Sequence, residues 1–190
     1  IMKKGDIAKI SKSFTEEELK ELTKTAHEHG LNVILDYVAN HVHQEHPMFK
    51  NDPTSCAPLI LPDGTKNIAM WNEHRLTTWF DEFIPTLDYS RTEIVETMTD
   101  SALYWIEHFG LDGFRHDACK HVPETFWRTL TKKIKERVEI PSGKPFYQVG
   151  ESYGSPQLIS SYVNSGMLTG QFDFNVSDDA SSVFALNSED

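Results

Sequence analysis

The chain has 190 residues, of which 38% are hydrophobic, 11% aromatic and 25% charged, and this composition excludes an intrinsically disordered or collagen-like protein. Its 29 acidic and 18 basic side chains give a formal net charge of -11. Because so acidic a surface repels phosphate backbones, we expect no nucleic-acid partner. No apolar run approaches the about 18 residues that cross a membrane, so no membrane span is predicted. The first residue is Ile1, and we expect the chain to be part of a longer protein whose cellular location stays open.

Helix and strand patterns alternate at the start of the chain. A capping residue, Ser13 or Thr15, followed by three glutamates predicts a helix that ends at Gly30. Residues 32–38 form a short, nearly continuous apolar run, which is typical of a buried parallel strand. Residues 42–90 hold several prolines and show no clear periodicity, and we interpret them as an irregular excursion that leaves the end of this strand.

Regular order returns after this excursion. The predicted elements are a helix over 91–109, a strand over 111–117, a helix over 123–138, a strand over 145–151, a helix over 156–164, a strand over 170–174 and a helix from near Asp178. Strands separated by helices imply parallel pairing with right-handed crossovers. Both a doubly wound sheet and a (β/α)₈ barrel satisfy this alternation.

Carboxylates mark the ends of three predicted strands. Asp36, Asp117 and Glu151 each lie at or near a carboxyl end. In a parallel barrel these ends converge on one face, and that face carries the active site. One such residue alone is more often a helix cap or a turn residue, but three together indicate a functional site.

The neighbours of these carboxylates predict different roles for them. Arg115 and Asp117 are two positions apart on a strand, so they project to the same side, and the guanidinium favours an ionised nucleophile. Asp36 could hold Arg115 through a bidentate pair, or the two could form a purely structural ion pair. The apolar residues before Glu151 are expected to raise its pKa and suit it to donate a proton. Glycoside hydrolysis needs two carboxyl groups that differ in this way.

Three motifs in these regions resemble those of the alpha-amylase family, glycoside hydrolase family 13. Residues 36–41 read DYVANH and resemble its motif D-x-x-x-N-H. Residues 113–121 read GFRHDACKH and resemble G-F-R-x-D-x-x-K-H, which is the most specific of the three. Gly150 and Glu151 follow an apolar strand, as in the third motif. The motifs occur in the family's order, and the resemblance covers almost the whole chain.

The resemblance implies roles for the catalytic residues. Asp117 would be the nucleophile that forms a covalent glycosyl-enzyme intermediate, and Glu151 would act first as general acid and then as base. Arg115 would orient and ionise Asp117. The anomeric configuration of the sugar would be retained, with the two carboxyl groups about 5–5.5 Å apart.

The resemblance also implies a set of substrate-binding residues. His41 would hydrogen-bond the sugar at the cleavage point, and Lys120 and His121 would line the neighbouring leaving-group side. Asp36 would be structural beneath them. The implied substrates are alpha-glucans such as starch, glycogen or maltooligosaccharides, and hydrolysis and glycosyl transfer both stay open.

No cofactor is required by this chemistry, but many family members hold a structural calcium ion. Asn40, the backbone at His121 and an aspartate of the insertion would bind it. Thr86 stands where that aspartate is expected, and a neutral hydroxyl is a poorer ligand for a hard cation. Calcium at Asn40 is therefore the weakest part of the resemblance.

The family's first two strands and its fourth motif have no counterpart in the sequence. Residues 1–41 and 91–190 therefore resemble strands three to six of a (β/α)₈ barrel, with residues 42–90 as an inserted subdomain. Four strands leave two open edges, which either the remainder of the parent barrel or a second copy in a homodimer of half-barrels would cover. We expect the isolated chain to have little or no activity.

Two other functions fit part of the pattern. His41, His43 and His46 could bind zinc in a metal-dependent barrel hydrolase, although this leaves Arg115 unexplained. A non-catalytic carbohydrate-binding relative is the second alternative, and the presence of both catalytic carboxylates argues against it. The aromatic residues Trp71, Trp79 and Phe80 could stack on sugar rings, but we expect at least two of them to pack the insertion's own core.

Overall fold

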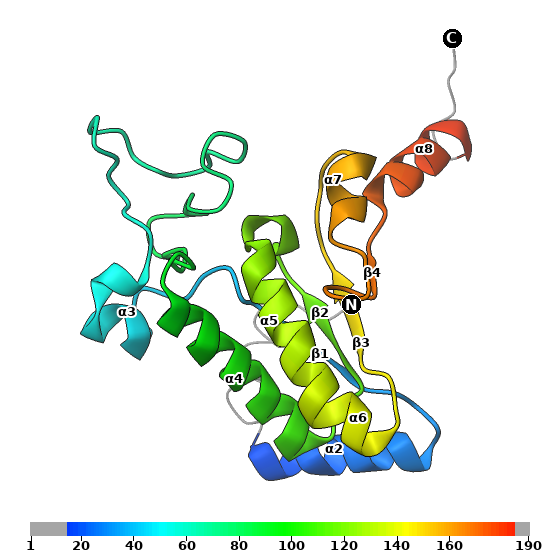
Figure 1. Ribbon diagram of the computed structural model, residues 1–190. Helices are drawn as coiled ribbons and strands as arrows, with labels where there is room; N and C mark the ends of the chain where they lie inside the picture. Colours follow the sequence, from blue (N-terminus) through cyan, green and yellow to red (C-terminus); the bar gives the residue numbers. More distant parts are fainter. Residues whose placement is uncertain (1–14, 185–190) are drawn as a thin grey trace.

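The computed structural model describes residues 15–184 and shows a four-stranded parallel sheet (Figure 1). The strand order is β1-β2-β3-β4, which follows the order along the chain. The strands are β1 (Ile34–Tyr37), β2 (Gly113–His116), β3 (Tyr147–Gly150) and β4 (Gly170–Gln171). All three strand pairs are parallel, as the alternation of helices and strands predicts. The described residues form part of a barrel wall rather than a closed barrel.

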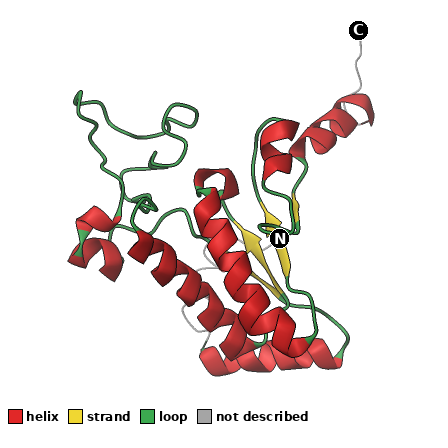
Figure 2. Ribbon diagram, viewed as in Figure 1, coloured by secondary structure: helices red, strands yellow, loops and turns green. Residues whose placement is uncertain are grey.

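Helices alternate with the strands along the chain. They are α2 (Glu16–Glu28), α3 (Pro47–Asn51), α4 (Thr92–Phe109), α5 (Glu124–Ile134), α6 (Ile140–Ser142), α7 (Pro156–Ser161) and α8 (Phe174–Phe184), with shorter turns η1 (Pro53–Ser55), η2 (Cys119–His121) and η3 (Lys135–Glu139). The long helices α4 and α5 pack side by side, and α2 contacts α4 (Figures 1 and 2). In residues 15–184 no helix is both long enough and apolar enough to cross a membrane.

The ends of the first helices follow from local chemistry. Thr15 caps α2 and forms a capping box with Glu18, which satisfies two backbone N–H groups at this end. The other candidate cap, Ser13, lies outside the described residues. Gly110 ends α4 with a φ of 63°, a left-handed conformation that glycine adopts without a steric cost.

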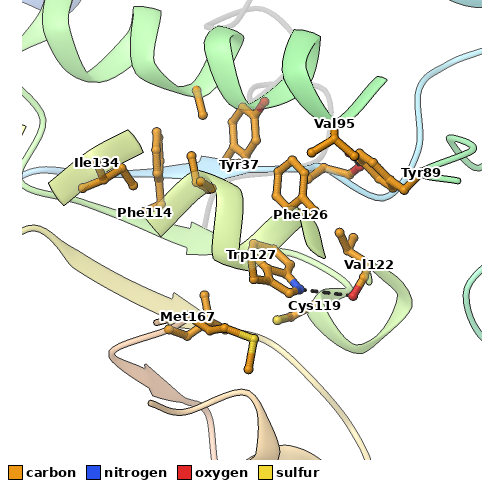
Figure 3. Close-up of a cluster of buried hydrophobic side chains, with 14 of the residues drawn as sticks. Tyr37, Tyr89, Val95, Phe114, Cys119, Val122, Phe126, Trp127, Ile134 and Met167 are labelled. Atoms are coloured by element: carbon orange, nitrogen blue, oxygen red, sulfur yellow. Dashed lines mark hydrogen bonds between the residues drawn. The ribbon is translucent and has the colours of Figure 1, made fainter. Parts of the chain in front are cut away.

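The core lies between the sheet and the pair α4 and α5 (Figure 3). Phe114 of β2 and both Phe126 and Trp127 of α5 are fully buried. The indole N–H of Trp127 donates to the carbonyl of Val122 at 3.2 Å, so this polar group is satisfied inside the core. This apolar layer fixes β2 against α5 and thereby sets the position of the residues that follow β2.

Several element boundaries differ from the sequence expectation. Within residues 15–184, β1 is at the edge of the sheet rather than buried, and Ile34 is 45% exposed because β1 has one neighbouring strand there. The strand expected over 170–174 is paired as a strand only at Gly170–Gln171, since α8 already begins at Phe174. The helix expected over 123–138 continues through η3 and α6 to Ser142, where Gly143 takes a positive φ.

The segment between β1 and α4 is irregular, as predicted. Apart from α3 and η1 it is described by turns and isolated bridges, such as His41 with Thr86 and Cys56 with Leu87. In Figure 1 it projects from the same end of the sheet as α7, which is the carboxyl end of the strands. Trp79 is buried and donates to the carbonyl of Ala57 at 2.8 Å, so it packs the segment's own core. The division into a barrel part and an inserted subdomain at 42–90 stays a prediction.

Candidate active site

The register of β2 and β3 brings the two candidate catalytic carboxylates to one edge of the sheet. His116 is opposite Gly150, so Asp117 and Glu151 are the next residues on neighbouring strands. The Glu151 N–H donates to the His116 carbonyl at 2.8 Å, and the Asp117 N–H donates to the Tyr37 carbonyl at 3.3 Å. Backbone hydrogen bonds therefore hold both residues at the carboxyl ends of the strands.

Arg115 joins three carboxylates at this edge. Its Nη1 lies 2.7 Å from Asp36 Oδ1 and 3.0 Å from Asp117 Oδ1, and its Nη2 contacts the carboxylate of Glu151. Desolvation lowers the pKa of Arg115, but the hydrogen bond and charge of Asp36, together with the charge of Asp117, outweigh it and raise the pKa. The expected bidentate pair with Asp36 is not formed, because the guanidinium is shared among the three acids.

The surroundings of Glu151 also differ from the expectation. Its side chain is 35% exposed and contacts a guanidinium, so the described residues do not enclose it in an apolar pocket. The apolar side chains before Glu151 pack into the core beside β3 and do not surround the Glu151 carboxyl group. Phe146 and Val149, for example, are buried within the fold.

A cleft of about 420 Å³ opens beside these carboxylates, which is within the size range of small-molecule sites. Its lining residues are Trp71, Phe80, Asp117, Ala118, Lys120, His121, Glu151, Ser152 and Tyr153. Four predicted site residues therefore meet in one cleft. The other four, Asp36, Asn40, His41 and Arg115, are not among the described residues that line it.

Two of these four residues lie together at the edge of the inserted segment. His41 Nδ1 is 3.2 Å from Asn40 Oδ1, and its ring centroid is 5.3 Å from that of Phe80. Burial lowers the pKa of His41, while the charge of Asp117 opposes this shift, so the imidazole lies within electrostatic reach of the candidate nucleophile.

The residues that would bind calcium do not fit that ion as they stand. The Asn40 amide N–H donates to the His121 carbonyl at 3.0 Å, so the two expected ligands satisfy each other. The buried Thr86 hydroxyl donates to the Thr78 carbonyl at 2.7 Å. Calcium needs several converging oxygen ligands. Here Asn40 Oδ1 lies 3.2 Å from the His41 ring, the His121 carbonyl accepts from Asn40, and the Thr86 hydroxyl donates to another carbonyl.

The alternative zinc site is not formed by the described histidines. Nowhere in residues 15–184 do three His, Cys, Asp or Glu side chains come together as a metal would require. His46 caps α3 by accepting from the Met48 N–H, and His43 accepts from the Glu45 N–H. Both rings thus have structural roles at exposed positions.

Lys120 and His121 form one wall of the cleft. The Lys120 ammonium donates to the Tyr153 carbonyl. The ring centroid of His121 lies 5.1 Å from that of Phe80 and 5.5 Å from that of Trp71, so two aromatic residues of the inserted segment pack on it. Burial lowers the pKa of His121 to about 4, and its imidazole is neutral at neutral pH.

Several residues of the cleft were not predicted from the sequence. Tyr153 and Ser152 follow Glu151 without a pattern of their own. Trp71 and Phe80 line the cleft, so only Trp79 of the three aromatic residues is confined to the core of the inserted segment. The sequence offers no signal for Ser152 and Tyr153, whereas the aromatic character of Trp71 and Phe80 already suggested that they could contact sugar rings.

Ala118, directly after Asp117, adopts a left-handed conformation with a φ of 49°. Because a Cβ is unfavourable there, we expect Ala118→Gly to leave the free energy of unfolding unchanged or to raise it by up to about 1 kcal/mol. We expect Ala118→Val to lower it by about 1–2 kcal/mol, since a β-branched residue is poorly tolerated at positive φ. Urea unfolding of the two variants tests this, and a valine variant as stable as the glycine variant would contradict it.

The chain resembles known proteins over most of its length. The family model described as "Alpha amylase, catalytic domain" matches residues 3–189. The chain belongs to the alpha-amylase family. A crystal structure of an Anoxybacillus alpha-amylase is 30% identical and covers 90% of this chain with a TM-score of 0.75, and the Geobacillus thermoleovorans alpha-amylase complexed with acarbose is 30% identical and covers 87% with a TM-score of 0.72. These structures establish the fold as part of an alpha-amylase (β/α)₈ barrel.

Curated relatives agree with this assignment. Alpha-amylase 2 of Dictyoglomus thermophilum is 29% identical over 84% of this chain, and a cyclomaltodextrinase of a Bacillus species is 30% identical over 69% of it. The chain spans 26% and 25% of the lengths of these two relatives, and 36% of each of the two crystal structures. The similarity to the alpha-amylase family therefore covers most of this chain but a minor part of each relative.

Proposed function

We propose that the protein carrying this chain cleaves alpha-glucans with retention of anomeric configuration, using Asp117 as nucleophile and Glu151 as general acid and base. The observation that carries this proposal is that both carboxylates line one cleft and contact one guanidinium, that of Arg115. Membership of the alpha-amylase family and the relatives named as amylases and a cyclomaltodextrinase support alpha-glucans as the substrate class.

The proposed reaction has two displacements. The Asp117 carboxylate attacks the anomeric carbon as the glycosidic C–O bond breaks, and Glu151 gives its proton to the leaving oxygen. Glu151 then removes a proton from water, or from an acceptor sugar, whose oxygen attacks the same carbon and releases Asp117. Nη2 of Arg115 contacts the Glu151 carboxylate, and the first step requires Glu151 in its protonated form. Lys120 and His121 bind the leaving-group side, His41 contacts the sugar at the cleavage point, and Asp36 holds Arg115.

Replacing Glu151 with Gln in the full-length protein that carries this sequence tests the acid–base role. We expect kcat/KM on a maltooligosaccharide to fall by about 10²–10⁴-fold, because the leaving oxygen then receives no proton. With alpha-maltosyl fluoride, whose leaving group needs no proton, the first step should keep most of its rate. NMR of the first product formed should show the alpha anomer.

Glu124→Gln is the matched control. Glu124 is an exposed carboxylate at the start of α5, where it pairs with Arg128, so its loss should leave turnover within about twofold. An equal loss on both substrates with Glu151→Gln, or a beta anomer as first product, would rule out the proposed mechanism.

A further inference from the structure

Arg75 joins three parts of the chain that are far apart in sequence. It lies in a turn of the irregular segment between β1 and α4. Its guanidinium donates to the carbonyl of Lys120, in η2 after β2, and to the hydroxyl of Tyr162, directly after α7, at 2.6 Å. Tyr162 is buried, and its hydroxyl also donates to the Lys120 carbonyl at 3.2 Å. Arg75 therefore connects the segment beside the cleft to the loop that carries Lys120.

The backbone of Arg75 makes a second contact with the same loop. Its carbonyl lies 2.7 Å from Nδ1 of His121, and a carbonyl can only accept, so Nδ1 carries the proton. In a neutral imidazole the other nitrogen, Nε2, is then an acceptor. One residue thus contacts both Lys120 and His121, which form a wall of the cleft.

The charges around the Arg75 guanidinium do not favour the stability of the fold. The polar contacts of the Arg75 guanidinium within residues 15–184 are to a carbonyl and a phenol, and not to a carboxylate. Arg75 and Lys120 are both cationic, and the Arg75 guanidinium donates to the backbone carbonyl of Lys120. Two cations placed together without an acid repel each other, so packing stability by itself does not explain an arginine here.

The contacts of Arg75 lie beside the residues that were expected to bind calcium. Asn40 donates to the His121 carbonyl, and Arg75 donates to the Lys120 carbonyl. Both adjacent carbonyls are therefore satisfied by N–H groups of the chain itself.

We propose that Arg75 is a positioning residue that holds Lys120 and His121 in place to bind the sugar on the leaving-group side of the cleft. This inference rests on the proposed alpha-glucan cleavage. Arg75 does not line the cleft itself, so it acts through the two residues that do.

Arg75→Met in the full-length protein should raise KM for maltopentaose about tenfold or more and change kcat less than threefold, because charge-assisted hydrogen bonds that order the binding wall are lost. Arg75→Lys should raise KM by a smaller factor than Arg75→Met, since an ammonium can replace only one of the two donors. Tyr162→Phe keeps the shape of a buried ring and should raise KM by a smaller factor. Arg91→Met is the control, since Arg91 pairs with Asp52 and Glu93 away from the cleft, and its KM should stay within twofold.

A nitrogen NMR measurement of His121 gives a readout that does not need activity. The Nδ1–H form should dominate in the unchanged protein, and Arg75→Met should shift it toward a mixture with the Nε2–H form. An Nε2–H form in the unchanged protein, or an unaltered KM and unaltered tautomer in the folded Arg75→Met variant, would overturn the inference. If the unchanged protein does not cleave alpha-glucans, the proposed function fails. The tautomer result still decides whether Arg75 positions His121.

Discussion

Asp117→Asn in the full-length protein is expected to lower kcat by about 10⁴-fold or more, the scale on which the loss of a covalent nucleophile acts. Asparagine keeps the shape of the side chain but cannot form the glycosyl ester. Arg115 keeps its contacts with Asp36 and Glu151 in this variant, so we expect the fold to persist. Initial rates on a maltooligosaccharide, with KM unchanged within about threefold, measure the effect.

A small external nucleophile provides a stricter test of the role of Asp117. Asp117→Gly leaves space beside the anomeric carbon, and azide should restore turnover and give a glycosyl azide of inverted, beta configuration. Asp100→Asn is the control, because Asp100 is an exposed residue of α4 paired with Lys133. Residual activity of Asp117→Asn above about 1% of the unchanged enzyme would contradict a covalent role.

The second large effect concerns stability in acid. His116 is fully buried in the core, and His121 is buried beside the cleft. Burial lowers the pKa of both imidazoles from 6.5 to about 4, while the unfolded chain binds their protons near the ordinary value. The neutral rings therefore contribute their full share to stability above about pH 6.5, and that share is lost as the pH falls toward 4. By pH 4, His116 should account for about 3 kcal/mol of lost stability, and His121 for less, because solvent in the cleft screens its charge.

His116→Gln tests the larger part of this dependence within the core. His116 Nε2 lies 3.0 Å from Gln148 Oε1, and glutamine can donate there without titrating. Urea unfolding at about pH 7 and about pH 4.5 should show a loss of stability about 2 kcal/mol smaller in this variant than in the unchanged protein.

His108→Gln is the control for this comparison, since His108 is an exposed residue in the last turn of α4, and its loss of stability should match that of the unchanged protein. The difference between the two pH values is the relevant quantity, because glutamine alters the core packing equally at both. Equal losses in His116→Gln and in the unchanged protein would show that His116 does not titrate on unfolding.

The sequence by itself determined the alternation of helices and strands, the parallel sheet and the positions of Asp117 and Glu151 at strand ends. Local chemistry explains this success. Apolar runs such as 32–38 form strands, the Thr15 cap starts a helix, and Gly110 ends one. Because parallel strands end at one edge, residues that follow neighbouring strands meet without further information.

Only the tertiary structure decided what surrounds these residues. Within residues 15–184 it showed that the guanidinium of Arg115 contacts three carboxylates, that Glu151 lacks the expected apolar enclosure, and that β1 is an edge strand. It also placed Arg75 and the aromatic side chains of the irregular segment against Lys120 and His121. These contacts join residues about 40 to 50 positions apart through a segment without periodicity, and such long-range packing leaves no regular pattern in the sequence.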